Sequence, residues 1–240
     1  MFDPKKMLFT GGGGLLGGEV RQRMPNSFYP LKSEFDVTDF DQMQKFIAEK
    51  EIELLVHAAA FISPPVIDKN PQKAIEVNII GTSNIVRLCM QHNIRLVYIS
   101  TDYVFDGNKG NYKEDDPVFP VNKYAWSKLG GECAVRLYDN ALIIRTSFSS
   151  NRFPFEKAFA DQWTSRESVS AIAAKIVAVL DKDVTGILHV GGPRKTVLEY
   201  ARELNNDEGI QPLYRNEVNF KVPVDTSFDC GLYDAVLGKR

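Results

Sequence analysis

The chain has 240 residues, 44% of them hydrophobic, which is enough for one main domain with a buried core. Its 29 Lys and Arg balance 31 Asp and Glu and form no basic run, so neither nucleic acid nor a membrane is an expected partner. The three cysteines are an odd number without a Cys-x-x-Cys pair, which suits a reducing cytoplasm and argues against a disulfide framework and a thiolate metal site. The three histidines do not have the spacing of metal ligands. No apolar run is long enough for a signal peptide or a membrane span, and this also favours a cytoplasmic location.

The first half of the chain alternates short apolar strands with helices. Strands are predicted at residues 6–10, 25–31, 53–60, 95–100 and 141–146. Helices are predicted from the glycine run to about residue 24, and at 39–50, 71–91 and 122–138. This alternation predicts an α/β fold, namely a Rossmann-type doubly wound parallel sheet with helices on both faces.

The second half follows a looser pattern. A helix is predicted at 169–180, a strand at 186–190 and a helix at 197–204, and the tail after residue 205 is irregular. We therefore expect a dinucleotide-binding Rossmann domain over residues 1–147. Residues 148–240 are expected to form a small substrate-binding lobe that is interleaved with the first part and not an independent domain.

Polar or small residues follow several of the predicted strands. A glycine run follows the first strand, HAAA (57–60) ends the third, and Ser100, Thr101 and Asp102 end the fourth. In a doubly wound sheet, ligands bind at the carboxyl ends of the strands. These segments therefore predict one shared site along that edge.

The glycine run has the spacing Gly-x-x-Gly-x-x-Gly at Gly11, Gly14 and Gly17. Glycines between a strand and a helix let the backbone approach a pyrophosphate at the helix N-terminus. The alternative is a flexible strand–helix turn, but the position after the first strand favours a dinucleotide.

The region after the second strand bears on which dinucleotide binds. An acidic residue there would select NAD, whereas this chain has Lys32 and Ser33, which suit a 2′-phosphate. NADP(H) is therefore expected in preference to NAD(H), although a solvated loop lysine is an equally simple explanation. Asp36 and Val37 are expected to line the adenine pocket. The alternative for Asp36 is a helix cap or a loop acid, although Asp39 suits a cap better.

Tyr124 and Lys128 lie four residues apart on a predicted helix and hence on one face. A free phenol has a pKa of about 10, and a nearby ammonium would lower it and make the tyrosine a usable general acid or base. The alternative is an exposed helical pair. The glycine loop, the hydroxyls after the fourth strand and this pair, in that order, favour catalysis.

These segments resemble the extended short-chain dehydrogenase/reductases, and within them the dTDP-4-dehydrorhamnose reductase group. The resemblance rests on TGGGGLLG (10–17), DVTD (36–39), HAAA (57–60), VNIIGTSN (77–84), YISTDYVFDG (98–107), YAWSKLGGE (124–132) and IIRTSF (143–148). It implies an NAD(P)H-dependent reductase that acts on a nucleotide-linked 4-keto-6-deoxy sugar in deoxysugar biosynthesis.

The resemblance also implies roles for individual residues. Thr101 would hydrogen-bond the substrate carbonyl, with Ser100 as second choice and as a cofactor contact. Tyr124 would protonate the carbonyl oxygen, and Lys128 would hold the nicotinamide ribose and tune Tyr124. The implied cofactor contacts further include Gly11, Gly14, Leu15, Leu16, Gly17, Ala58, Ala59 and Ala60, and the implied sugar contacts are Tyr103 and Phe148. Lys32, Asp36 and Val37 join the expected cofactor contacts from the analysis of the region after the second strand.

The chain departs from the family pattern at several positions. Phe148 replaces a common tryptophan, which leaves the sugar specificity open. Tyr103 stands where related dehydratases carry a glutamate, so reduction is favoured over dehydration, whereas a sugar epimerase remains an alternative. The stretch 161–166 lacks the family's Gly and Pro, and the lobe is trimmed, which leaves Arg152 and Arg166 as guesses for nucleotide contacts.

A second class of function also fits the resemblance. The regulatory subunit of methionine adenosyltransferase resembles the same reductase group and implies an NADP-binding partner protein without turnover. The presence of Thr101, Tyr124 and Lys128 favours catalysis, whereas the trimmed lobe suits a binder. A homodimer is compatible with the resemblance, and the sequence leaves the oligomeric state open.

Overall fold

The computed structural model describes residues 2–238, with residues 64 and 65 described by their backbone alone. Its centre is a sheet of five parallel strands in the order β1-β2-β3-β4-β9. The strands are β1 (Met7–Thr10), β2 (Leu54–His57), β3 (Arg95–Ile99), β4 (Ala141–Thr146) and β9 (Gly186–Val190). The predicted α/β fold with a parallel sheet is therefore confirmed.

Alternate residues of the strands supply two separate cores. Phe9 and Val97 face one cluster, and their neighbours Leu8 and Leu96 face the other. Side chains of a strand point alternately to its two faces, so a strand that is buried on both sides reads as a continuous apolar run. This explains why these strands were recognisable from the sequence.

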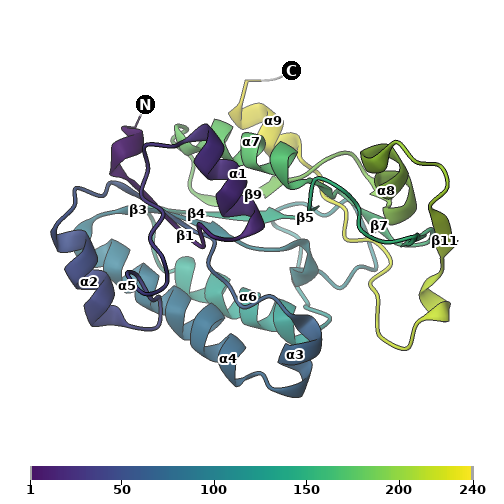
Figure 1. Ribbon diagram of the computed structural model, residues 1–240, viewed down its shortest axis with the longest axis horizontal. Helices are drawn as coiled ribbons and strands as arrows, with labels where there is room; N and C mark the ends of the chain where they lie inside the picture. The colour runs from purple at the N-terminus through teal and green to yellow at the C-terminus, as the bar shows by residue number, and fades with distance from the viewer. Residues whose placement is uncertain (1, 239–240) are drawn as a thin grey trace.

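Helices cover both faces of the sheet (Figure 1). One face carries α1 (Leu15–Arg23), α7 (Val169–Leu180) and α9 (Gly231–Val236). The other face carries α2 (Phe40–Ala48), α3 (Pro64–Lys69), α4 (Gln72–Ala74), α5 (Thr82–His92) and α6 (Lys123–Val135). The side chains of Asp39, Asn122 and Ser168 accept backbone N–H groups at the starts of α2, α6 and α7, as expected for helix caps.

The helix predicted at 71–91 contains a wider turn in its middle. A π-helical segment, Ile75–Gly81, lies between α4 and α5. Such turns are often found at functional sites because the extra residue redirects side chains. Here the turn carries Asn78, a buried residue that holds the loop after β2.

The prediction of a strand over residues 25–31 is wrong, because only one residue of this segment pairs with the sheet. Only Phe28 pairs with β1, through a single parallel bridge in which Phe28 N–H donates to Met7 O at 2.8 Å. Pro25 and Pro30 flank this bridge, and prolines have no N–H group with which to extend it. The bridge still has a topological consequence, because Phe28 lies on one side of β1 and β2 on the other. The strand order thus reverses at β1, where ligands of doubly wound folds bind.

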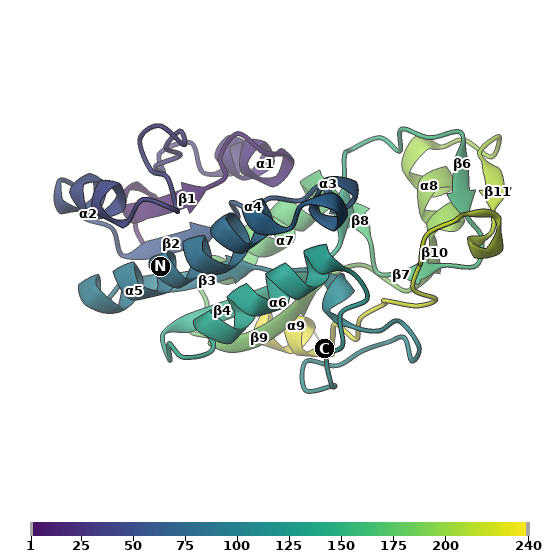
Figure 2. The ribbon, with the colours of Figure 1, turned by 90° about the horizontal axis from the view of Figure 1, so that it is seen from below.

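Residues 148–238 contribute to both parts of the molecule. α7 and β9 belong to the central body. The lobe, at one end of that body, consists mainly of α8 (Val197–Asn205) and short two-stranded sheets (Figure 2). These sheets pair β5 (Phe148–Ser149) with β8 (Glu167–Ser168), β6 (Lys157–Phe159) with β11 (Gln211–Leu213), and β7 (Trp163–Thr164) with β10 (Lys195–Thr196). Across residues 2–238, no helix combines the length and apolarity needed to cross a membrane.

Candidate active site

The glycine loop after β1 is shaped by close backbone contacts. Gly11 has φ +78°, and a Cβ on it would lie 2.9 Å from the Ala59 nitrogen. A Cβ on Gly17 would lie 2.5 Å from the Gly11 carbonyl oxygen. The Gly14 N–H donates to that same oxygen at 2.9 Å. Larger residues at Gly11 or Gly17 would therefore force the loop open.

The loop presents an uncapped helix start. Gly14 is the N-cap of α1, and no side chain of residues 2–238 caps the N–H groups of the first turn. Leu15 is exposed, whereas Leu16 is buried in the core and anchors the turn. The arrangement has the backbone donors and the room that a pyrophosphate needs, so the loop fits the expected dinucleotide.

Two of the residues predicted around the adenosine, Lys32 and Asp36, form an ion pair. Lys32 pairs with Asp36 at 3.3 Å, and Asp36 Oδ1 also accepts the Thr38 N–H and hydroxyl at 3.0 and 2.8 Å. Val37 is buried against Gly81. Ala58, Ala59 and Ala60 follow β2 and are half-buried, with the Ala59 N–H donating to Thr10 Oγ1 at 3.2 Å.

The end of β3 and the start of α6 bring two hydroxyls together. Thr101 follows β3 and caps a 3-10 turn, Asp102–Val104, where its oxygen accepts the Tyr103 N–H at 3.3 Å. The Thr101 hydroxyl donates to Asp102 Oδ1 at 3.2 Å, and it lies close enough to the Tyr124 phenol to favour its ionised form and oppose the rise in its pKa. The structure thus places the predicted hydrogen-bond donor beside the predicted acid.

Tyr124 is a phenol that resists ionisation. Burial raises its pKa far above the ordinary value, and the negative charge of Asp102 raises it further. The expected lowering by Lys128 is not found, because Lys128 Nζ lies over the Tyr98 ring, 4.1 Å from its centroid. At neutral pH Tyr124 therefore holds its proton, as a general acid must.

Lys128 is buried on the same helix. Burial lowers its pKa to about 7, although the Glu132 carboxylate opposes the shift. The Tyr98 hydroxyl donates to the Lys128 carbonyl at 3.1 Å, so Tyr98 contacts both ends of this residue. His57 is neutral, with its pKa lowered to about 3 by burial and by Lys128, and its ring bonds Thr10 and Thr82. This agrees with a structural role for His57.

Asp102 is a buried carboxylate whose role the sequence did not suggest. Thr226, from the end of the chain, donates to Asp102 Oδ2 at 2.8 Å. Burial raises the pKa of Asp102, and the Arg166 guanidinium and the Thr226 and Ser147 hydroxyls oppose this. Thr226 belongs to the DTSF segment (225–228), and no local pattern there indicates that it contacts Asp102.

Asn78 is a second residue whose contribution was missed. Its side chain accepts the Phe61 N–H at 2.7 Å and donates to the Phe61 carbonyl at 2.9 Å and to Ser127 Oγ at 2.8 Å. It therefore joins the π turn to the loop after β2 and to α6, the helix that carries Tyr124. The VNIIGTSN motif contained this residue, but motif spacing alone does not reveal its partners.

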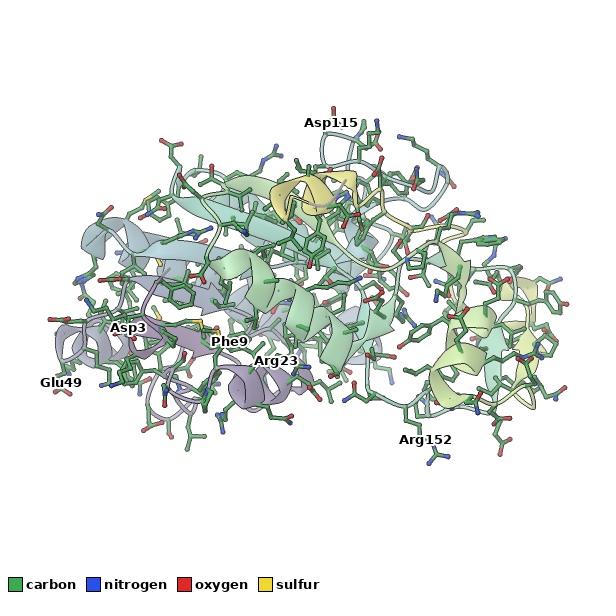
Figure 3. The ribbon with its side chains drawn as sticks, turned by 90° about the horizontal axis from the view of Figure 1, so that it is seen from above. Asp3, Phe9, Arg23, Glu49, Asp115 and Arg152 are labelled. Carbon is green, nitrogen blue, oxygen red and sulfur yellow. The ribbon has the colours of Figure 1, made fainter. Side chains whose placement is uncertain are left out.

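The other predicted residues lie in different surroundings. Ser100 is buried, and its hydroxyl has no partner among the described residues. Tyr103 is half-buried near Tyr124, and Phe148 is half-buried on β5 against the body's core. Arg152 is exposed and points outward from the edge of the lobe (Figure 3). Arg152 therefore does not join the site, whereas the positive charge of Arg166 is near enough to oppose the rise in the pKa of Asp102.

Residues 5–227 match the RmlD substrate binding domain family. The dTDP-4-dehydrorhamnose reductase of Aggregatibacter actinomycetemcomitans is 31% identical over 180 residues, 71% of this chain and 61% of that protein. The methionine adenosyltransferase 2 subunit beta of Bos taurus is 26% identical over 226 residues, 78% of this chain and 67% of that protein. The chain thus spans about two thirds of these relatives.

A solved structure resembles the whole chain. The crystal structure of a hypothetical dTDP-4-dehydrorhamnose reductase from Sulfolobus tokodaii has a TM-score of 0.87 and 31% identity, and covers 98% of this chain and 95% of that one. The match therefore includes the lobe as well as the sheet. The chain belongs to the RmlD substrate binding domain family.

Proposed function

We propose that this protein is an NADPH-dependent reductase of a nucleotide-linked 4-keto-6-deoxy sugar, of the dTDP-4-dehydrorhamnose reductase type. The observation that carries the proposal is the placement of Thr101, at the carboxyl end of β3, close enough to Tyr124, in the first turn of α6, for its hydroxyl to act on the phenol. The names of the relatives from Aggregatibacter and Sulfolobus support the same activity.

Each hydroxyl has a distinct task in this reaction. When bound, NADPH supplies the hydride that reduces the sugar carbonyl. Thr101 donates a hydrogen bond to the carbonyl oxygen and so stabilises the charge that develops there. Tyr124 donates its phenolic proton to the same oxygen, and its raised pKa keeps that proton available at neutral pH.

Lys128 and Asp102 set the conditions for the proton transfer. Asp102 opposes formation of the phenolate, so a positive charge must compensate as Tyr124 loses its proton. Lys128, one helical turn away, would have to leave the Tyr98 ring on cofactor binding in order to supply this charge and to hydrogen-bond the nicotinamide ribose. Tyr103 stands where a dehydratase would need an additional acid, which favours simple reduction.

The second candidate is a dinucleotide-binding partner protein without turnover. It is favoured by the bovine relative, which is named as a subunit of methionine adenosyltransferase 2. The presence of the full hydroxyl pair together with Lys128 favours the reductase.

Purified protein mixed with NADPH and a panel of nucleotide-linked 4-keto-6-deoxy sugars distinguishes the two. The reductase consumes NADPH with at least one sugar, and Tyr124→Phe loses this activity by about 10²- to 10⁴-fold, the usual contribution of a general acid. Trp126→Phe, an exposed position on the same helix, serves as the matched control. NADPH binding without turnover on any sugar would instead support the partner protein.

A further inference from the structure

The aromatic ring of Tyr29 and the guanidinium of Arg21 lie on one side of the glycine loop. A Cβ on the buried Gly12 would lie 2.9 Å from Tyr29 Cβ and 3.1 Å from Arg21 Nη2. Arg21 stacks on the Tyr29 ring, with its guanidinium carbon 4.8 Å from the ring centroid, as in a cation–π pair. A positive charge therefore stands directly beside the backbone of the loop.

The Tyr29 ring is held in place by the body of the protein. Its hydroxyl donates to the Met24 carbonyl at 3.0 Å, and its ring packs 5.8 Å from that of Phe9. Tyr29 follows Phe28, the residue that bridges to β1 on the side opposite β2. Arg21 thus rests on a fixed platform at the point where the strand order reverses.

The charge of Arg21 is available to a ligand. Its side chain is exposed, and no carboxylate within residues 2–238 forms an ion pair with it. Arg23, two residues later, is by contrast bound to Glu19 at 2.8 Å and to Ser170. A Cβ on Gly13 would meet no atom within 4 Å, so the space next to this platform is open.

The other charged groups of the adjoining loop are engaged. Lys32, the expected partner of a 2′-phosphate, pairs with Asp36. Glu34, the acid that could serve a ribose hydroxyl, accepts the Leu31 N–H at 2.7 Å and so closes its own turn. Arg21 is therefore better placed than Lys32 to bind an added phosphate.

We propose that Arg21, supported by Tyr29, binds the 2′-phosphate of NADP(H) and makes this protein select NADP(H) over NAD(H). The inference rests on the proposed dinucleotide binding. A pyrophosphate on the glycine loop directs the adenosine toward the end of the Phe28 segment, so the ribose lies next to Gly12. A guanidinium matches a phosphate with two parallel hydrogen bonds, and an exposed arginine gives up little hydration to form them.

The test compares the binding of NADPH and NADH to the purified protein by titration calorimetry. The wild type is expected to bind NADPH at least about tenfold more tightly than NADH, the scale of charged hydrogen bonds. Arg21→Gln should weaken NADPH binding by about 10- to 100-fold and leave NADH binding within about twofold. Arg87→Gln, which removes the same charge from a similar stack on Phe40 far from the loop, is the matched control and should change neither.

Several outcomes would overturn the inference. Equal affinities of the wild type for NADPH and NADH would do so, and so would an Arg21→Gln variant with an unchanged ratio. A loss of NADPH preference in Lys32→Gln alone would assign the phosphate to Lys32. In each of these cases dinucleotide binding itself survives, whereas binding of neither dinucleotide would overturn the proposed function as well.

Discussion

The carboxyl edge of the sheet and the C-terminal lobe hold their charged groups in different ways. Behind the edge, Arg145 pairs with Glu132 at 2.9 Å, and their side chains are 1% and 0% exposed. In the lobe, Lys195 pairs with Glu203, whose side chain is 62% exposed. Removing one partner of a buried ion pair lowers the free energy of unfolding strongly, whereas an exposed pair contributes little to that free energy.

The two regions also differ in how tightly their parts are joined. The groups around Tyr124 come from strand ends and from a helix packed on the main core. The lobe relies on short strands and a small core of its own around Tyr200, and it has an open depression of about 760 Å³ near Arg215. We infer that the body fixes the chemistry and that the lobe is the part free to vary with the substrate.

The strongest test of this contrast is Glu132→Gln. It leaves the Arg145 charge buried without its partner and should lower the free energy of unfolding by about 3–5 kcal/mol. Glu203→Gln makes the same change in the lobe and should lower it by less than about 1 kcal/mol. Urea unfolding of both variants measures the difference, and equal effects would contradict the contrast.

The second test addresses the hydroxyl pair. Thr101→Val should lower kcat of the sugar reduction by about 10²- to 10³-fold, because it removes a donor to the developing oxyanion. Thr101→Ser keeps the hydroxyl and should recover most of the activity. A larger loss in Ser100→Ala than in Thr101→Val would instead make Ser100 the donor.

The third test concerns the glycine loop. Gly17→Ala places a methyl group 2.5 Å from the Gly11 oxygen and should weaken dinucleotide binding by roughly tenfold or more, because small displacements at a binding site are costly. Gly18→Ala is the matched control, since a Cβ there meets nothing within 4 Å. Calorimetric titration of the two variants compares them, and similar affinities would show that the loop is not a rigid cradle.

The fourth test concerns the pH dependence caused by Lys128. Its pKa is about 7 in the folded protein and ordinarily 10.5, so the unfolded chain binds more protons between these values. The free energy of unfolding therefore rises with pH, by roughly 2 kcal/mol from pH 7 to 9. Lys128→Met should lack this rise when unfolding is followed in urea at pH 7, 8 and 9. A parallel rise in the variant would mean that Lys128 is not desolvated.

The sequence predicted the body more fully than the lobe, for a physical reason. The strand at 141–146 and the helix at 169–180 were placed correctly because burial on both faces gives a strand a continuous apolar run, whereas burial on one face gives a helix a periodic pattern. The prediction of a strand at 25–31 failed because a single bridge, at Phe28, forms without any regular pattern of apolar residues around it. Short strands such as Gln211–Leu213 are formed by distant pairing and leave no local signal.

Within the site, motifs located the residues but not their surroundings. Tyr124 and Lys128 were found from their spacing, yet the lowered phenol pKa expected from that spacing is not found. Burial and Asp102 determine the pKa of Tyr124, and both depend on residues far away in the chain, including Thr226. Tertiary contacts of this kind cannot be inferred from the spacing of two residues on one helix.

The return of the chain to Asp102 has a consequence for biosynthesis. Besides Thr226, Asp225 donates its N–H to the Gly107 carbonyl, and the Tyr112 N–H donates to the Ser227 carbonyl. Asp102 and Thr226 are 124 positions apart in the sequence, so the contacts around Asp102 can form only after residues 225–227 have left the ribosome. A product that terminates before residue 225 would contain all five strands of the central sheet but would lack these contacts.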